Sequence, residues 1–211
     1  MTKIDLFYLI KIGEQKYIHE LYEHGVIFMN DIDYFRQYED TEPRGDKEEG
    51  IKGIEQIADI KLLHNGKVLA HKGSGQLKFR DYDNNGNIYS LMTITSLEDP
   101  AKFQIDEKNK IFGDCFVVIT SVKDFINRIE DKLKELKFEY EYGPVRYYNL
   151  KKHSGPLDVF CKSDNFEYQK EFRFFVKRNE PGPLEFEIDS IEDISFIFDI
   201  EKLDKIGINY S

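Results

Sequence analysis

The first 30 residues alternate between apolar runs and an amphipathic stretch. Residues 5–12 and 26–30 are mostly apolar, which favours two strands. Between them, residues 13–25 place apolar side chains on one helical face and end at Gly25, a residue type that commonly stops a helix. The chain is therefore predicted to open as strand, helix, strand.

A second amphipathic pattern follows in the middle of the chain. Over residues 122–141, apolar side chains recur at the three- and four-residue spacing of a helix, with Phe125, Ile129 and Leu133 among them. This segment is predicted to be the one long helix, at about 122–141.

The remaining apolar segments are short and favour strands. Because strands outnumber helices, we predict an α+β fold with mixed, mainly antiparallel sheets. No linker or repeat divides the chain, so a single domain over residues 1–211 is expected. The segments predicted as further strands are 54–71, 75–96, 112–121, 143–150, 166–177 and 182–203.

Two predicted turns contain the dipeptide Asn-Gly. The stretches "HNGK" and "DNNGN" each separate strand-like segments, and Asn-Gly there is a strong hairpin signal. Gly66 and Gly86 would take the positive φ that such turns demand.

The stretch "FEYQKEFRFFVK", residues 166–177, has one face that is not apolar. In an extended chain Phe172 and Phe174 point one way, whereas Gln169, Glu171 and Arg173 point the other. An unpaired Glu in a covered strand costs several kcal/mol, about the same order as a buried unsatisfied polar group. The row could be an internal ion-pair network or a solvated edge, or it could line a ligand cleft.

Composition and charge narrow the classes of function. The net charge of −10 argues against broad binding of bulk nucleic acid, which needs clustered cations. No apolar run approaches the roughly 18–20 residues needed to span a bilayer. The N-terminus does not resemble a signal peptide. We expect a cytoplasmic protein without membrane contact, with a small-molecule nucleotide or a protein as partner.

Other polar residues could line a binding site. Lys162 and Tyr168 lie in the connection that leads to residues 169–173 and suit an anionic or planar ligand, although a surface Lys and a core Tyr are the simpler interpretation. Arg44 and Asp46 lie in a charged loop that could be a lid or simply solvated. Asn30 ends a predicted strand, where a turn or cap is also common. No His or Cys spacing suits a metal site.

Several quoted segments occur in a recognisable order. They are "HGVIFMNDIDYFRQYED", "RGDKEEG", "FGDCFVVITSVKDFINRI", "GPVRYYN" and "VFCKSDNFEYQKEFRFFVK". Together they resemble a family of small bacterial and phage-associated proteins of unknown function, itself similar to a larger group found near phage-defence genes. The family's K…YQxE(F/Y)R strand motif falls on Lys162, Tyr168, Gln169, Glu171 and Arg173.

A weaker similarity is to the ADP-ribosyltransferase fold. Such enzymes also open strand–helix–strand and carry a late Q-x-E, which Gln169-Lys170-Glu171 matches. The resemblance implies that Glu171 holds the nicotinamide ribose of NAD and stabilises an oxocarbenium-like transition state, while Gln169 orients the acceptor. The first strand lacks the usual Arg or His, so Tyr8 or Lys11 would substitute for it.

Three hypotheses follow. The first is an NAD- or nucleotide-handling transferase or hydrolase, with Glu171, Gln169 and Arg173 as catalytic residues and Tyr8, Asn30, Arg44, Asp46, Lys162 and Tyr168 around the substrate. The only cofactor-like molecule this implies is NAD, as a substrate. The second is a non-catalytic module that senses a protein or a nucleotide. The third is that the polar face is purely structural.

Overall fold

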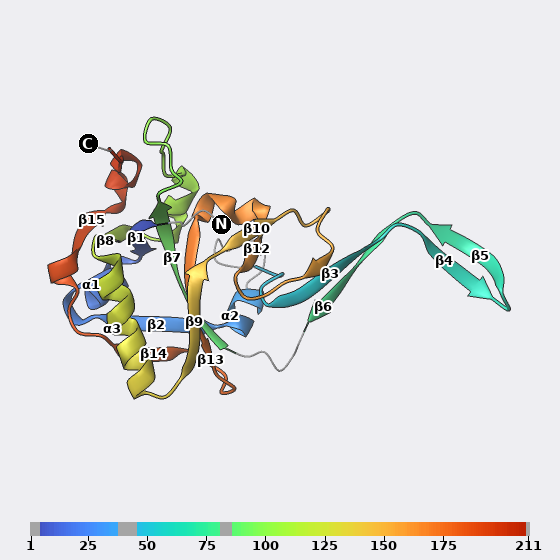
Figure 1. Cartoon of the computed structure of the whole chain (residues 1–211), viewed down its shortest axis with the longest axis horizontal. Coiled ribbons are helices and arrows are strands. Elements are labelled where there is room, and N and C mark those ends of the chain that lie inside the picture. Colours follow the sequence, from blue (N-terminus) through green and yellow to red (C-terminus); the bar gives the residue numbers. More distant parts are fainter. Residues whose placement is uncertain (1–4, 38–45, 81–85, 210–211) are drawn as a thin grey trace.

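A sheet of eight strands forms the centre of the molecule (Figure 1). The computed structural model describes residues 5–37, 46–80 and 86–209, and its mainly antiparallel sheets with a few helices confirm the predicted α+β class. The strands of the central sheet are β1 (Leu6–Gly13), β2 (Val26–Asp31), β7 (Gly86–Thr95), β8 (Cys115–Ile119), β9 (Glu139–Pro144), β13 (Glu171–Lys177), β14 (Leu184–Glu187) and β15 (Ser195–Asp199).

Strand β7 is the hub of this sheet. It pairs antiparallel with β13 through Arg173↔Ser90 and its neighbours. It also pairs antiparallel with β1, towards its C-terminal end, and with β2, towards its start. Strand β13 then pairs with β9, which extends the sheet by one more strand. Segments from the beginning, middle and end of the chain therefore meet at β7.

Two helices cover one face of the sheet. Helix α1 (Gln15–His24) ends at Gly25, whose φ of 69° lies in the left-handed region, so the strand–helix–strand opening is confirmed. Helix α3 (Val122–Glu135) is the longest in the described part of the chain. The core on this side joins both helices to the strands through Leu9, Ile18, Val117, Phe125, Ile129, Leu133, Phe172 and Phe174.

Helix α3 is shorter than predicted. It ends at Glu135, with Leu136 as the capping residue, and Lys137 takes a φ of 61°. The Phe138 amide then donates to the Leu133 carbonyl at 3.0 Å, and β9 begins at Glu139. The apolar side chains beyond 136 alternate with glutamates, which suits an extended strand paired with β13. The strand predicted over 143–150 is divided between β9 and β10 (Arg146–Tyr148).

The opposite face of the sheet is divided into three regions. One apolar cluster there includes Ile88 and Phe175, and another includes Ile10 and Met92. Along β7 these regions fall on every second residue, and Ser90 lies between them. The space between the two apolar clusters is therefore lined by polar side chains.

Residues 51–80 form a long β-arm that extends away from the body (Figure 1). Strands β3 (Ile51–Ile57) and β6 (Gly75–Arg80) pair at its base, and β4 (Ile60–His64) and β5 (Lys67–Lys72) pair at its tip. Asn65 and Gly66 both have positive φ, so the first predicted hairpin is confirmed.

The second predicted hairpin is wrong. Strand β6 pairs with β3, and β7 pairs with β1, β2 and β13, so the two strands that flank "DNNGN" are not partners. Residues 83–85 of that stretch lie outside the described residues. Gly86 lies in β7 without a positive φ, and a Cβ there would come within 2.2 Å of the Phe175 ring. Gly86 is needed for close packing rather than for a turn.

The other elements are short. No helix in the described ranges is both long and apolar enough to cross a membrane. Strand β10 pairs parallel with β12 (Cys161–Ser163), and β11 (Gly155–Pro156) joins the base of the arm. The remaining helical segments are α2 (Ile32–Gln37) and the 3₁₀ turns over Glu107–Phe112, Asp164–Gln169, Glu192–Ile194 and Ile200–Lys205.

Candidate functional site

The polar row identified in the sequence lies on one side of β13. Glu171 and Arg173 share a face of the strand, as the alternation predicts, and Phe172 and Phe174 enter the helix-covered core on the other. Gln169 was expected on the same strand, but it ends a 3₁₀ turn, and Lys170 follows with a φ of 43°. Gln169 therefore reaches the cluster through a turn and not through strand alternation.

Arg173 is enclosed and fully paired. Its Nε donates to Glu171 Oε1 at 2.6 Å, and Nη1 and Nη2 donate to the two carboxylate oxygens of Glu49 at 2.7 and 2.8 Å. Nη1 also donates to the Val159 carbonyl at 2.5 Å, and Nη2 to Glu171 Oε2 at 3.4 Å. These contacts use all five N–H groups of a guanidinium. Only 1% of the residue is exposed.

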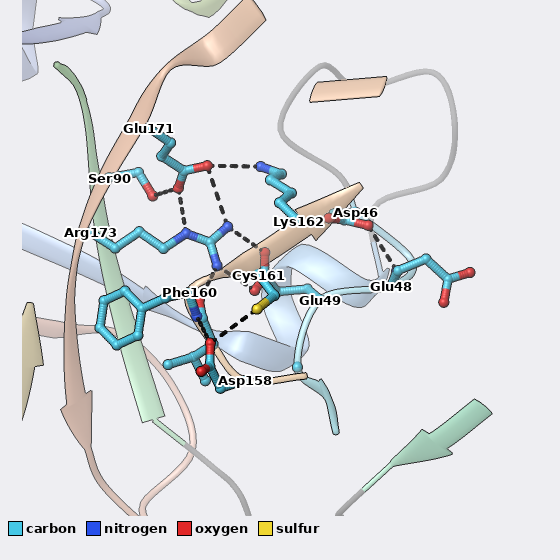
Figure 2. Close-up of polar contacts among 12 residues, drawn as sticks. Asp46, Glu48, Glu49, Ser90, Asp158, Phe160, Cys161, Lys162, Glu171 and Arg173 are labelled. Carbon is cyan, nitrogen blue, oxygen red and sulfur yellow. Dashed lines mark hydrogen bonds and ion pairs between the residues drawn. The ribbon is translucent and has the colours of Figure 1, made fainter. Parts of the chain in front are cut away.

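Glu171 is paired just as completely. Its Oε1 accepts from Ser90 Oγ and Arg173, and its Oε2 accepts from Lys162 Nζ at 3.1 Å and from Arg173 (Figure 2). The Glu171 amide donates to the hydroxyl of Tyr147 at 2.8 Å. Burial alone would raise the pKa of Glu171, but the charges of Arg173 and Lys162 outweigh it and hold the pKa well below its usual range.

Lys162 joins the preceding turn to this pair. Its Nζ donates to Gln169 Oε1 at 2.8 Å and lies 4.7 Å from the centre of the Phe166 ring. Gln169 Nε2 in turn donates to the Tyr168 hydroxyl at 3.3 Å. The structure therefore brings together four of the predicted site residues with Tyr168 beside them.

Glu49, Lys162, Glu171 and Arg173 are called the charge network below. Each is less than 9% exposed, and the two acids balance the two bases. A buried cluster of zero net charge with its hydrogen bonds satisfied avoids the large penalty of an isolated buried charge. The network is thus electrically complete without any ligand.

Asp46, another predicted site residue, is buried beside the charge network. Its Oδ1 accepts from the amide of Glu48 at 2.8 Å. Burial, together with the negative charge of Glu49, raises the pKa of Asp46 to about 6.

The other predicted residues lie apart from this cluster. Tyr8, on β1, is 37% exposed, and Asn30 is paired in register with Ile88 within β2. Asp31 rather than Asn30 accepts from the first turn of α2, through the Tyr34 amide at 2.7 Å. Arg44 lies outside the described residues.

Lys11 does not take the place of a first-strand cation next to Glu171. It points to the helix-covered face, where its Nζ lies 4.2 Å from the centre of the Tyr89 ring and donates to the Ser90 carbonyl at 2.8 Å. Glu171 lies on the opposite face of the sheet. Because consecutive residues of a strand face opposite ways, its neighbour Ile10 occupies that other face.

Two members of the polar cluster were not predicted as site residues. Ser90 is a lone hydroxyl at every-second-residue spacing within an apolar strand, and that spacing is a signal the sequence contains. Glu49 was visible only as part of a charged loop. Its pairing with Arg173, 124 residues later, leaves no local pattern.

The geometry favours a structural role for Glu171 over a catalytic one. Shallow hollows are lined by Ile54, Phe79 and Pro156 at the base of the arm, and by Arg128 and Asp189 near β14. Neither includes a member of the charge network. A ligand that hydrogen-bonded to Glu171 would first have to displace Lys162, Ser90 or Arg173. Within the described residues, no group of three or more His, Cys, Asp or Glu is arranged to hold a metal.

Comparisons with protein-family models, with curated proteins and with solved structures found no match to this chain. The resemblances drawn from the sequence motifs therefore stay predictions, and the residues themselves carry the functional argument.

Proposed function

We propose that this chain is a non-catalytic binding protein whose β-arm, residues 51–80, recognises an acidic surface on a partner protein. The observation that carries this proposal is the exposed apolar tip of the arm. Leu62, Leu63, Val68 and Leu69 are between 46% and 63% exposed, and both strands at the tip are open to solvent. Clustered exposed apolar side chains of this kind mark interaction surfaces.

The charge of the arm supports an acidic partner. Residues 51–80 contain six basic and two acidic side chains, a formal charge of +4, which leaves −14 for the rest of the chain. Complementary charge speeds encounter and selects partners. A two-stranded ribbon is also only marginally stable alone in water, so a partner that covers it would stabilise it.

The charge network gives this arm a firm base. Glu48 pairs with Lys78 and Arg80 of β6, while the next residue, Glu49, pairs with Arg173 in the central sheet. Gln56 and Gln76, on β3 and β6, both donate to the Leu150 carbonyl, at 3.0 and 2.7 Å. The arm is thereby attached to the body on both of its strands, which suits an element that presents a surface.

Site-specific photo-crosslinking in cells that produce the chain tests this proposal. A photoreactive side chain replaces Leu62 on the arm in one variant and Leu97 on the body in a matched control; the two native residues are 61% and 64% exposed. We expect a protein adduct from position 62 only, and its loss when Lys67 and Lys72 are changed to Glu. No adduct from position 62, or equal adducts from both positions, would overturn the proposal.

A second candidate is an NAD- or nucleotide-handling enzyme centred on Glu171. The observation in its favour is that Gln169 and Glu171, the Q-x-E pair, converge on Lys162. Thermal-shift measurements with NAD, ADP-ribose and common nucleotides test it. A ligand that raises the midpoint of the wild type, and forms product only when Glu171 is present, would favour this enzyme over the binding protein.

A further inference from the structure

We infer that the partner of the arm is a second copy of this chain, and that the tip of the arm docks along the open edge of β9. This inference rests on the proposed function and names the partner of the same surface. It is carried by three features: the open edges of the arm, the open edge of β9, and the charges that the two present.

The tip of the arm has two unpaired edges. Within the described residues, β4 and β5 hydrogen-bond only with each other. Open strand edges are templates for pairing with another chain, and proteins usually shield them. Here the edge strands instead carry Leu62 and Leu69, both more than 60% exposed.

Strand β9 is open on the side away from β13. Its residues pair with β13 over Glu139–Pro144, and among described residues its backbone makes no hydrogen bond on the other side. Its exposed side chains include Glu139, Glu141 and Tyr142. An added strand could therefore bond to its backbone, the pairing known as β-augmentation.

The charges of these two edges are complementary. Residues 60–72 at the tip contain three Lys and no acid, whereas β9 contains two Glu and no base. Glu139 has one exposed contact, with Lys177 at 3.3 Å, and Glu141 has no ion pair within the described residues. Lys67 and Lys72 likewise have none there. Lysines of the arm would thus meet carboxylates that are largely unneutralised.

The docking must take place between two molecules. The tip points away from the body and is well separated from β9 of its own chain (Figure 1). Each copy supplies one basic arm and one acidic edge, so two copies related by a two-fold axis would satisfy both arms and both edges at once. Closure of this kind gives a dimer and not an open fibre.

Light scattering coupled to size exclusion, on the full chain at low and high salt, tests the inference. We expect a mass twice the 25.0 kDa of the chain at low salt. K67E/K72E on the arm and E139K/E141K on β9 should each give monomers, because like charges then meet. A mixture of the two variants should recover the dimer, because its arms and edges are again complementary in both directions.

The matched control is K16E/K102E, which makes the same change of charge on the body at side chains that are 74% and 84% exposed. It should remain dimeric, and all variants should keep the wild-type melting curve of a folded monomer or dimer. A monomeric wild type, persistent dimers of the reversed variants, or no recovery on mixing would overturn the inference. If the wild type is monomeric but position 62 still crosslinks to another protein in cells, the inference fails while the proposed function stands.

Discussion

Arg173 in β13 and Glu49 at the base of the arm form a two-pronged ion pair across 124 residues of sequence. Both side chains are almost fully buried, and the pair lies where the arm joins the central sheet. The position of the arm relative to the body therefore depends on one guanidinium.

Glu49→Ala should destabilise the chain strongly. The substitution leaves Arg173 buried without one of its two acids, and loss of one partner from a buried pair typically costs about 3–5 kcal/mol. Urea unfolding gives the free energy directly. Glu55→Ala, at an exposed position on β3, is the control and should change it by less than about 0.5 kcal/mol. A loss below about 1 kcal/mol for the Glu49 variant would mean that the pair contributes little.

Removing both partners should cost less than the two single substitutions suggest. Glu49→Leu leaves an excess positive charge in the network and Arg173→Met leaves an excess negative charge, whereas the double variant leaves Glu171 opposite Lys162. A double-mutant cycle in urea should show a favourable coupling of roughly 1–3 kcal/mol, as expected for residues in contact. Additive effects within error would contradict the pairing.

Asp46 should make wild-type stability fall as pH rises. Its pKa is about 6 in the folded chain against an ordinary 3.8, so the folded chain holds this proton more tightly than the unfolded chain. Stability is therefore lost between these two pKa values and stays lost above the higher one, by on the order of 3 kcal/mol.

Asp46→Asn removes this dependence while keeping an oxygen for the Glu48 amide. The difference in free energy of unfolding, variant minus wild type, should grow from pH 4 to pH 7. Glu171, whose pKa is lowered, stabilises the fold above its unfolded pKa and loses that effect as pH falls. Both chains share this contribution, so it cancels in the difference. A difference that is flat with pH would refute a raised pKa for Asp46.

Gly86→Ala should destabilise the sheet through overpacking. An added Cβ would lie 2.2 Å from the Phe175 ring and 2.7 Å from the Val176 carbonyl. Forcing such a group into a packed core costs about 1–3 kcal/mol. Gly73→Ala is the matched control, because a Cβ there meets nothing within 4 Å. Thermal unfolding of the two variants should separate them clearly, and equal midpoints would be evidence against the close packing at Gly86.

Local patterns predicted the local parts of the fold. The opening from β1 to β2 and the Asn65-Gly66 hairpin follow from periodicity and turn chemistry, which act over a few residues. The alternation along β13 also placed Glu171 and Arg173 correctly on one face. The end of α3 was missed because residues 136–141 remain compatible with helical spacing, and only pairing with β13 makes them extended.

The site needed information that no local pattern holds. Whether Glu171 faced a ligand or internal partners depended on Lys162, Ser90 and Glu49, which come from three separate segments. The second Asn-Gly signal failed for the same reason, because β6 and β7 each found partners distant in sequence. Side-chain spacing identified the polar row, but only the fold shows that its charges are already neutralised.

The connections of β7 have a consequence for synthesis on the ribosome. Ser90 precedes its partner Glu171 by 81 residues, so at typical rates of translation β7 waits roughly 4–16 s for β13 to be made. The tip of the arm needs only contacts within residues 60–72 and can form early. A nascent chain therefore exposes its apolar arm and an incomplete sheet together for seconds, which is the period in which a chaperone or a neighbouring nascent chain would encounter it.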